Sequence, residues 1–263
     1  MEQSSSAFAP TVLQRWTQRQ NLLPGLAMVA LAAAGWIYVA RQSSSTGSMG
    51  SMGMDGTGGG VVFLSGWTAM MMAMMVPATL PLILLYRSIA RNRLSPTQSR
   101  VGMVVLLTGY LVVWAAAGVP VYAYSLFAEA AGSLATVLPA ALLLVGGVYQ
   151  FTPLKCACHA RCSSPLFFLL QNWRPGATGA LRLGVVHGLD CVGCCAGLMV
   201  GLVALGMMNL AWMLTAAVII FAEKTLPNSH RIARPLGVVM VAGGVGLLAT
   251  SLFGGMATGM DSM

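Results

Sequence analysis

Charged residues are scarce in this chain. Lys, Arg, Asp and Glu together make up 8% of its 263 residues, whereas 57% of the residues are hydrophobic. A soluble domain usually carries about 25% charged residues. So few charges cannot cover the surface of a water-soluble particle of this size, so we expect lipid to surround most of the chain.

Acidic residues are scarcer than basic ones, with 6 Asp and Glu against 14 Lys and Arg, for a net charge of +8. A basic excess can indicate nucleic-acid binding, but no basic face with interleaved aromatic residues is present. Basic residues also accumulate in the cytoplasmic loops of membrane proteins. We therefore expect no nucleic-acid partner, and a lipid bilayer as the environment.

Familiar catalytic and nucleotide-binding motifs are absent from the sequence. It has no P-loop, no Ser/His/Asp set, no paired catalytic carboxylates and no stretch large enough for a soluble ATPase domain. The 6 Cys fall in two short stretches, neither in a segment expected outside the cell, which excludes a secreted disulfide framework. We therefore do not expect an enzyme.

Seven apolar segments are long enough to be transmembrane helices, which need about 20 residues at roughly 1.5 Å each. They are Leu22–Ala40, Val61–Tyr86, Val101–Phe127, Val137–Phe151, Leu183–Gly206, Met207–Ala222 and Pro235–Phe253. The first is too long for the apolar core of a signal peptide and is interpreted as a retained anchor. The predicted fold is an all-α, polytopic transmembrane bundle of about seven helices. A tight turn near Asn209 leaves open that the fifth and sixth segments form one bent span.

The basic residues predict the orientation, because 13 of the 14 lie in alternate loops that share one side. This side is the cytoplasm, and the membrane is expected to be the bacterial inner membrane. Residues 1–21 are then cytoplasmic, and residues 22–253 form a single transmembrane domain. Within that domain, loop 41–60 is external and the Cys/His-containing loop 154–182 is cytoplasmic. The tail 254–263 is external, unless the fifth and sixth segments are one span.

The external loop Arg41–Gly60 reads RQSSSTGSMGSMGMDGTGGG, which is a flexible Gly/Ser linker by composition. It contains Met49, Met52 and Met54, and the tail GGMATGMDSM repeats the pairing of Met with Asp. One interpretation is low-complexity drift. The other is capture of a soft cation by thioether sulfurs in an oxidising compartment, where free thiols do not survive.

Residues 156–162, which read CACHARC, place three thiols and an imidazole within seven positions. The candidate ligands are Cys156, Cys158, His159 and Cys162. Zinc and Cu(I) both accept such ligands. The neighbouring Lys155 and Arg161 are expected to favour the thiolate form that binds metal. The alternative is a set of reduced, unpaired cysteines at the membrane interface.

A second group of candidate ligands lies in the fifth apolar segment, at positions i, i+3, i+4, i+7 and i+8, which share one helix face. These residues are His187, Asp190, Cys191, Cys194 and Cys195. A buried Asp in a membrane helix costs roughly 2.5–3.5 kcal/mol and marks a functional candidate. Asp190 is expected to ligate metal directly or to orient His187. The alternative is that these side chains are small polar packing residues.

The same segment carries Gly193, Gly197 and Gly201 at a spacing of four, about 100° around the helix from the cysteines. Such glycines permit close approach of a neighbouring helix, either in this chain or in a second copy. They therefore suggest a homodimer as one possibility.

In the second segment, Met71, Met74 and Met75 share a face. Core packing is the favoured interpretation of this face, and a thioether relay for Cu(I) is the alternative. Pro77 and Pro81 are expected to kink or loosen the same helix.

The pair Glu223-Lys224 ends the sixth segment near the level of both cysteine groups. We interpret it as a helix-end charge pair that anchors the membrane interface.

The stretch from Tyr149 to Lys224 resembles the DUF2182 family of bacterial integral membrane proteins, described as predicted metal-binding proteins. The resemblance rests on Tyr149-x-x-Thr152-Pro153-Leu154-Lys155-x-x-Cys158, Cys162-x-Ser164-Pro165, Trp173-x-x-Gly176, His187-Gly188-x-x-Cys191-x-Gly193-Cys194-Cys195, Met208-Asn209-Leu210-x-Trp212-Met213, Glu223-Lys224 and Trp67-x-x-Met70-x-x-Ala73-Met74-Met75-x-Pro77. It implies metal binding, some members being labelled copper chaperones. The matching candidate ligands are Cys158, Cys162, His187, Cys191, Cys194 and Cys195. Cys156 and His159 have no assigned position in that pattern.

The sequence therefore favours a membrane-embedded protein that binds a soft metal, Cu(I) before zinc, and stores, relays or delivers it, for example to a cuproprotein. One alternative is a membrane thiol–disulfide oxidoreductase that uses the vicinal pair Cys194-Cys195 beside Cys191. Another is an assembly factor or subunit of a membrane complex whose metal site is structural.

Overall fold

The computed structural model describes residues 19–45, 57–206, 209–225 and 230–260, and this part of the chain is helical without strands. Its elements are α2 (Arg19–Ser45), α3 (Thr57–Arg93), α4 (Pro96–Ala130), the 3₁₀ helix η2 (Gly132–Thr136), α5 (Leu138–Tyr149), α6 (Pro153–Cys162), α7 (Pro165–Asn172), α8 (Gly176–Leu205), α9 (Leu210–Thr225) and α10 (His230–Met260). Each of the seven apolar segments therefore coincides with a helix, and the all-α class is confirmed.

Among the described residues, four helices are long and apolar enough to cross a membrane, which is compatible with a multi-pass membrane protein. They are Gly59–Arg93, Pro96–Ala130, Gly176–Leu205 and Ala233–Ser251. A fifth span results if Leu134–Tyr149 and Pro153–Cys162, bent by 67° at their junction, are counted together. The apolar part of α2 and the 16-residue α9 are shorter. The predicted count of seven spans is not confirmed.

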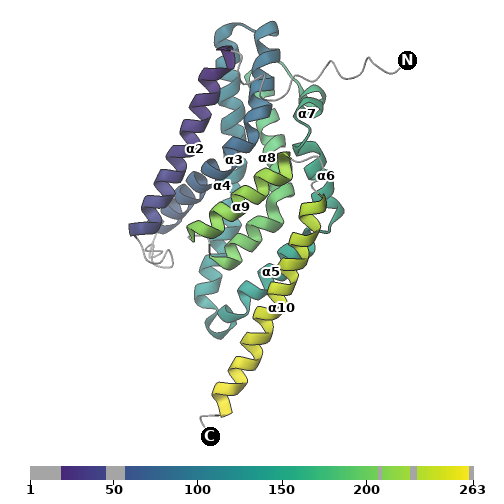
Figure 1. Cartoon of the computed structure of the whole chain (residues 1–263). Coiled ribbons are helices and arrows are strands. Elements are labelled where there is room, and N and C mark those ends of the chain that lie inside the picture. The colour runs from purple at the N-terminus through teal and green to yellow at the C-terminus, as the bar shows by residue number, and fades with distance from the viewer. Residues whose placement is uncertain (1–18, 46–56, 207–208, 226–229, 261–263) are drawn as a thin grey trace, which may run out of the picture.

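The long helices form one elongated bundle around α8 (Figure 1), which packs against α4, α5 and α6. Helix α2 lies along α3, and α10 lies along α5. The start of α2 and the end of α10 lie at opposite ends of the bundle (Figure 1). Helix α8, which carries three of the six cysteines, thereby lies in the interior of the bundle.

The predicted glycine stripe of α8 is covered within this chain. A Cβ atom on Gly193 would lie 2.6 Å from Cys158 Sγ of α6, and one on Gly197 would lie 2.8 Å from the carbonyl oxygen of Gly146 in α5. At Gly201 the neighbour is the methyl group of Met240 in α10, at 2.6 Å. These glycines bring helices of one chain together, so they do not offer the surface for a second copy that the sequence suggested.

Segment 154–182, which we expected to form a loop, instead contains most of α6, all of α7 and the start of α8. Helices α6 and α7 each begin with a proline that follows an N-cap residue, Thr152 before Pro153 and Ser164 before Pro165. Proline suits the first helical position because its missing N–H needs no partner there. The Thr152 hydroxyl also accepts a hydrogen bond from the Lys155 N–H at 3.4 Å. The helical form of α6 decides which way its cysteines point.

Helices α8 and α9 are two helices divided at the turn near Asn209, where the sequence left one bent span as an alternative. Helix α8 ends at Leu205, and the φ of +98° at the following Gly206 suits a residue without a side chain. The Asn209 side chain accepts hydrogen bonds from the N–H groups of Ala211 and Trp212, at 3.0 and 3.4 Å, and so caps α9. Helix α3, in contrast, continues without interruption through Pro77 and Pro81.

Most of the external loop, including Met49, Met52 and Met54, lies outside the described residues. Helix α10 runs to Met260 and so includes most of the segment that we expected to be a tail.

Candidate metal centre

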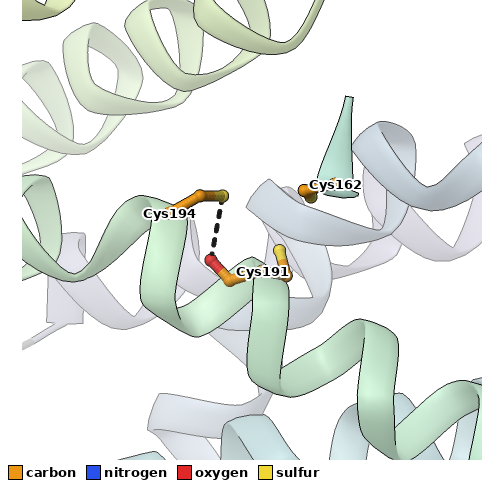
Figure 2. A group of neighbouring side chains, drawn as sticks. All are labelled: Cys162, Cys191 and Cys194. Carbon is orange, nitrogen blue, oxygen red and sulfur yellow. Dashed lines mark hydrogen bonds between the residues drawn. The ribbon is translucent and has the colours of Figure 1, made fainter. Parts of the chain in front are cut away.

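Three thiols from two helices converge in the core of the bundle. Cys162 comes from the end of α6, and Cys191 and Cys194 come from one face of α8 (Figure 2). Their sulfur atoms all lie within 4.8 Å of one another. Their exposed fractions are 8%, 0% and 2%. We call these residues the sulfur triad; among the described residues, they form the group with the spacing of a metal site.

Further sulfur and oxygen atoms surround the sulfur triad. Cys195 is also buried, and its Sγ lies 3.4 Å from that of Cys194. The Tyr110 hydroxyl lies 3.1 Å from Cys191 Sγ, and the Cys194 thiol donates to the carbonyl oxygen of Cys191 at 3.2 Å. All six cysteines are free thiols. Cys195 is thus placed as a fourth sulfur beside the triad.

The cation at the sulfur triad is Lys224, which the sequence interpretation assigned to another role. Its Nζ donates a hydrogen bond to Cys191 Sγ at 2.9 Å. We interpreted Glu223 and Lys224 as a charge pair that anchors the membrane interface. This interpretation is wrong, because Glu223 instead binds Lys155 at 3.0 Å. A lysine ammonium beside a sulfur atom favours the thiolate that a metal needs.

Lys155 and Arg161, which we expected to act on the thiols, are engaged elsewhere. Lys155 is buried and donates to Glu223 and to the side-chain oxygen of Gln150. Arg161 donates to the Asp190 carboxylate at 3.2 Å. Both interactions hold α6 in place, one against α9 and one against α8. At the sulfur triad, the cation in contact with a thiol is therefore Lys224.

The two other candidate ligands on α8 do not join the sulfur triad. His187 is buried against the rings of Tyr110 and Phe168, with centroid distances of 5.8 and 5.2 Å. Within the described part of the chain, its Nδ1 has no hydrogen-bond partner. Asp190 binds Arg161 through Oδ1 while Oδ2 has no partner there, so it does not orient His187.

The methionine face of α3 packs into the same core as the sulfur triad. Met71, Met74 and Met75 are 0–5% exposed and belong to the buried cluster that contains Cys162, Cys191, Cys194 and Cys195. The same cluster includes Met70, Met199, Met213 and Met240. Core packing of this face is confirmed, in the same buried cluster as the thiols.

The CACHARC segment is divided between two environments. Cys162 joins the sulfur triad, and Cys158 is half-buried against Gly193. Cys156 is exposed and, with His159, lines a separate cavity of about 430 Å³. The nine candidate ligands therefore do not form one site.

The chemistry of the sulfur triad suits a soft ion. Thiolate and thioether ligands select Cu(I), for which three sulfurs are sufficient. A structural zinc site takes four ligands, for which Cys195 would have to join the triad. Burial of all four sulfurs keeps water and oxidants away from a bound ion.

Comparison with known proteins gives one family. The family model described as "PpoB2: Copper chaperone" matches residues 64–247. This range contains all the helices from the first turns of α3 to the middle of α10, and with them every cysteine. No curated protein and no solved structure matches the chain.

Proposed function

Because the chain belongs to the PpoB2 family of copper chaperones, we propose that it binds Cu(I) at the sulfur triad and passes the ion to an acceptor such as a cuproprotein. The observation that carries this proposal is the convergence of Cys162, Cys191 and Cys194 within 4.8 Å in the core. A chance set of core cysteines would not need a lysine among them. Here Lys224 lies 2.9 Å from Cys191 Sγ.

Charge balance supports this assignment. Three thiolates around Cu(I) carry a net charge of −2, which is costly to hold in a low-dielectric core without a partner. The Lys224 ammonium reduces this to −1. The neighbouring Tyr110 hydroxyl can donate a further hydrogen bond to Cys191, since it lies 3.1 Å away. The chain itself thus supplies both the cation and the hydrogen-bonding hydroxyl.

The proposed path into and out of the sulfur triad uses the other sulfur atoms. Met71, Met74 and Met75 would relay the ion along α3. The Met49, Met52 and Met54 segment would capture or release it on the external side. This path presumes a multi-pass protein of the bacterial inner membrane with its basic loops in the cytoplasm. Weak thioether ligands suit a relay because they release Cu(I) more readily than thiolates do.

The test is copper binding by detergent-purified protein under anaerobic conditions, measured by competition with a chromophoric Cu(I) chelator. We expect one tightly held copper per chain, lost in Cys162→Ser, Cys191→Ser and Cys194→Ser. Cys156→Ser is the matched control, because its thiol is exposed and apart from the triad. It should keep the tight copper. Retention of tight copper by Cys191→Ser and Cys194→Ser would refute the proposal. Zinc in place of copper in the purified wild type would show that the bound metal is zinc.

Thiol–disulfide exchange is the second candidate, and it rests on the 3.4 Å separation of Cys194 and Cys195 Sγ. Exchange requires an attacking thiolate to reach a disulfide sulfur in a mixed-disulfide intermediate. Both thiols are 2% exposed, so a substrate disulfide cannot reach them in this conformation. Metal binding needs only a small ion to enter, and it is therefore favoured.

A further inference from the structure

Cys158 lies on the face of α6 that contacts α8, but it is not a member of the sulfur triad. It precedes Cys162 by four residues, so both point to the same face of α6, with Cβ atoms about 5–6 Å apart. Cys158 packs against the buried cluster that contains the triad. It is only half-buried, whereas Cys162 is 8% exposed. Cys158 is therefore a thiol that contacts the core and is also accessible from outside it.

The Cys158 sulfur lies against the backbone of α8 at Gly193. A Cβ atom on Gly193 would lie 2.6 Å from Cys158 Sγ, so the glycine leaves the space that this sulfur occupies. The next residue, Cys194, belongs to the triad. The Tyr149 hydroxyl donates to the Gly193 carbonyl oxygen at 2.6 Å, and it lies within electrostatic range of Cys158, Cys194 and Cys195. Cys158 is thus held beside the cysteines of α8.

The ion pair of Arg161 and Asp190 fixes the register of α6 against α8. Arg161 donates to Asp190 Oδ1 at 3.2 Å. Arg161 lies three residues after Cys158 on α6, and Asp190 lies three residues before Gly193 on α8. The contacts therefore run in opposite directions along the two helices, which are antiparallel here. This register places Cys158 one helical turn from the triad member Cys162.

A buried carboxylate oxygen favours a cation beside Cys158. The Asp190 side chain is 7% exposed, and its Oδ2 has no hydrogen-bond partner within the described ranges of the chain. This carboxylate lies within electrostatic range of the Cys158 thiol. A buried polar atom without a partner is costly, and a positive ion beside it offsets part of that cost. The surroundings of Cys158 therefore combine a soft ligand with an attraction for a cation.

We propose that Cys158 is the exchange ligand of this protein, the thiol that takes Cu(I) from a thiolate-bound carrier and transfers it to the sulfur triad. This inference rests on the proposed function of the triad. A thiolate carrier is the expected partner, because thiolates are the ligands that select Cu(I). The same steps in reverse release the ion to an acceptor.

Transfer is a ligand exchange in which copper remains Cu(I) and no electron moves. The bond from copper to the carrier sulfur breaks as the bond to Cys158 Sγ forms, and the Cys158 proton passes to the departing thiolate. The bond to Cys158 then breaks as bonds to the triad form. One triad thiol returns a proton to Cys158, and any other triad thiol that is still protonated releases its proton to water.

The test measures rates and affinity separately on the full-length protein in detergent, under anaerobic conditions. The probe is the Cu(I)–glutathione complex, mixed rapidly with metal-free protein. Excess chromophoric chelator then stops the reaction, and the copper that it does not capture promptly is the copper of the triad. Cys158→Ser should keep the wild-type affinity but load at least about tenfold more slowly, equivalent to a barrier about 1.4 kcal/mol higher.

Release of copper from Cys158→Ser to excess glutathione should slow by the same factor, because the ratio of the two rates is the equilibrium constant. A merely structural role of Cys158 would change affinity or unfolding instead. Cys156→Ser is the matched control, since it makes the same substitution in the same helix about 160° around the axis from Cys158. It should load and release copper at the wild-type rates.

The outcomes separate this proposal from the proposed function. Wild-type loading and release rates in Cys158→Ser would refute the exchange role and leave the triad intact. Loss of tight copper in both Cys158→Ser and Cys158→Ala would also refute it, because Cys158 would then be needed to hold the ion. Tight copper retained by Cys191→Ser would overturn the function of the triad itself. Tight copper at equilibrium in Cys158→Ser shows in addition that the variant is folded.

Discussion

At the scale of single residues, the most informative side chain is Lys224. Its ammonium group contacts Cys191 of α8, while the adjacent Glu223 binds Lys155 of α6. Without a cation nearby, the three thiolates with a bound Cu(I) would carry a net charge of −2. The position of Lys224 therefore predicts a charge-dependent affinity.

Replacing Lys224 with Met should weaken Cu(I) binding by about 30-fold, because removing one partner of a buried charge pair costs roughly 2 kcal/mol or more. Lys224→Arg keeps the charge and should lose much less affinity. Chelator competition at fixed pH measures both variants. Equal affinities of Lys224→Met and the wild type would show that the ammonium does not act on the bound ion.

The sequence predicted part of this site. The spacing of Cys191 and Cys194 places them on one face in any helix, and so they were found. The division of Cys156 from Cys162 was not predicted, because it depends on residues 153–162 being helical. In a helix, two positions six residues apart point about 120° away from each other around the axis. Lys224 was not assigned to the thiols because its contact with Cys191 arises from the packing of α9 beside α8, which no local spacing encodes.

At the scale of the elements, the glycines decide how closely the helices approach α8. Gly146 of α5 and Gly197 of α8 face each other, and a Cβ atom on either would lie 2.7–2.8 Å from the other's carbonyl oxygen. Backbone atoms cannot move aside as a flexible side chain can. Helices α5 and α8 would therefore have to separate, and α6 follows directly after α5.

Gly197→Ala should destabilise the protein by roughly 1–3 kcal/mol, as overpacking does in a filled core. Because α5 leads into α6, the variant should also hold copper less tightly. Gly243→Ala in α10 is the matched control, since a Cβ atom there meets nothing within 4 Å. It should leave unfolding unchanged or raise stability slightly, because alanine favours a helix. Thermal unfolding in detergent compares the two, and equal midpoints would contradict the predicted contact.

The sequence predicted the elements better than their relation to the membrane. Apolar runs located seven helices, because every backbone polar group in lipid must be paired within its helix. The number of spans was harder to predict from the sequence. Four to five spans are clear, because one pair of helices, Leu134–Tyr149 and Pro153–Cys162, is bent by 67° and α9 is short. Length and composition alone do not show whether a short helix crosses the membrane or lies within the bundle without crossing it.

At the scale of the whole molecule, the orientation in the membrane determines which compartment reaches the cavity of Cys156. The basic residues predict that this side is cytoplasmic. Cys156 is an exposed cysteine, whereas Cys162, Cys191, Cys194 and Cys195 are buried. One thiol can therefore report the orientation of the entire bundle.

A membrane-impermeant maleimide should label the protein in inverted membrane vesicles and not in intact cells. Cys156→Ser should remove most of the label, which assigns it to this residue. Labelling of intact cells at Cys156 would show the opposite orientation. In that case, the cavity of Cys156 would open to the external side.

The adjacency of Glu223 and Lys224 has a consequence for how this protein can change. One residue of α9 corresponds to about 100° of helix rotation, so Glu223 reaches Lys155 and Lys224 reaches Cys191 only in this phase. Inserting or deleting one residue before them would turn both at once, misplacing the ammonium and the carboxylate together. The last turn of α9 thus sets two contacts with one register. We expect that no insertion or deletion in α9 before Glu223 is compatible with copper binding.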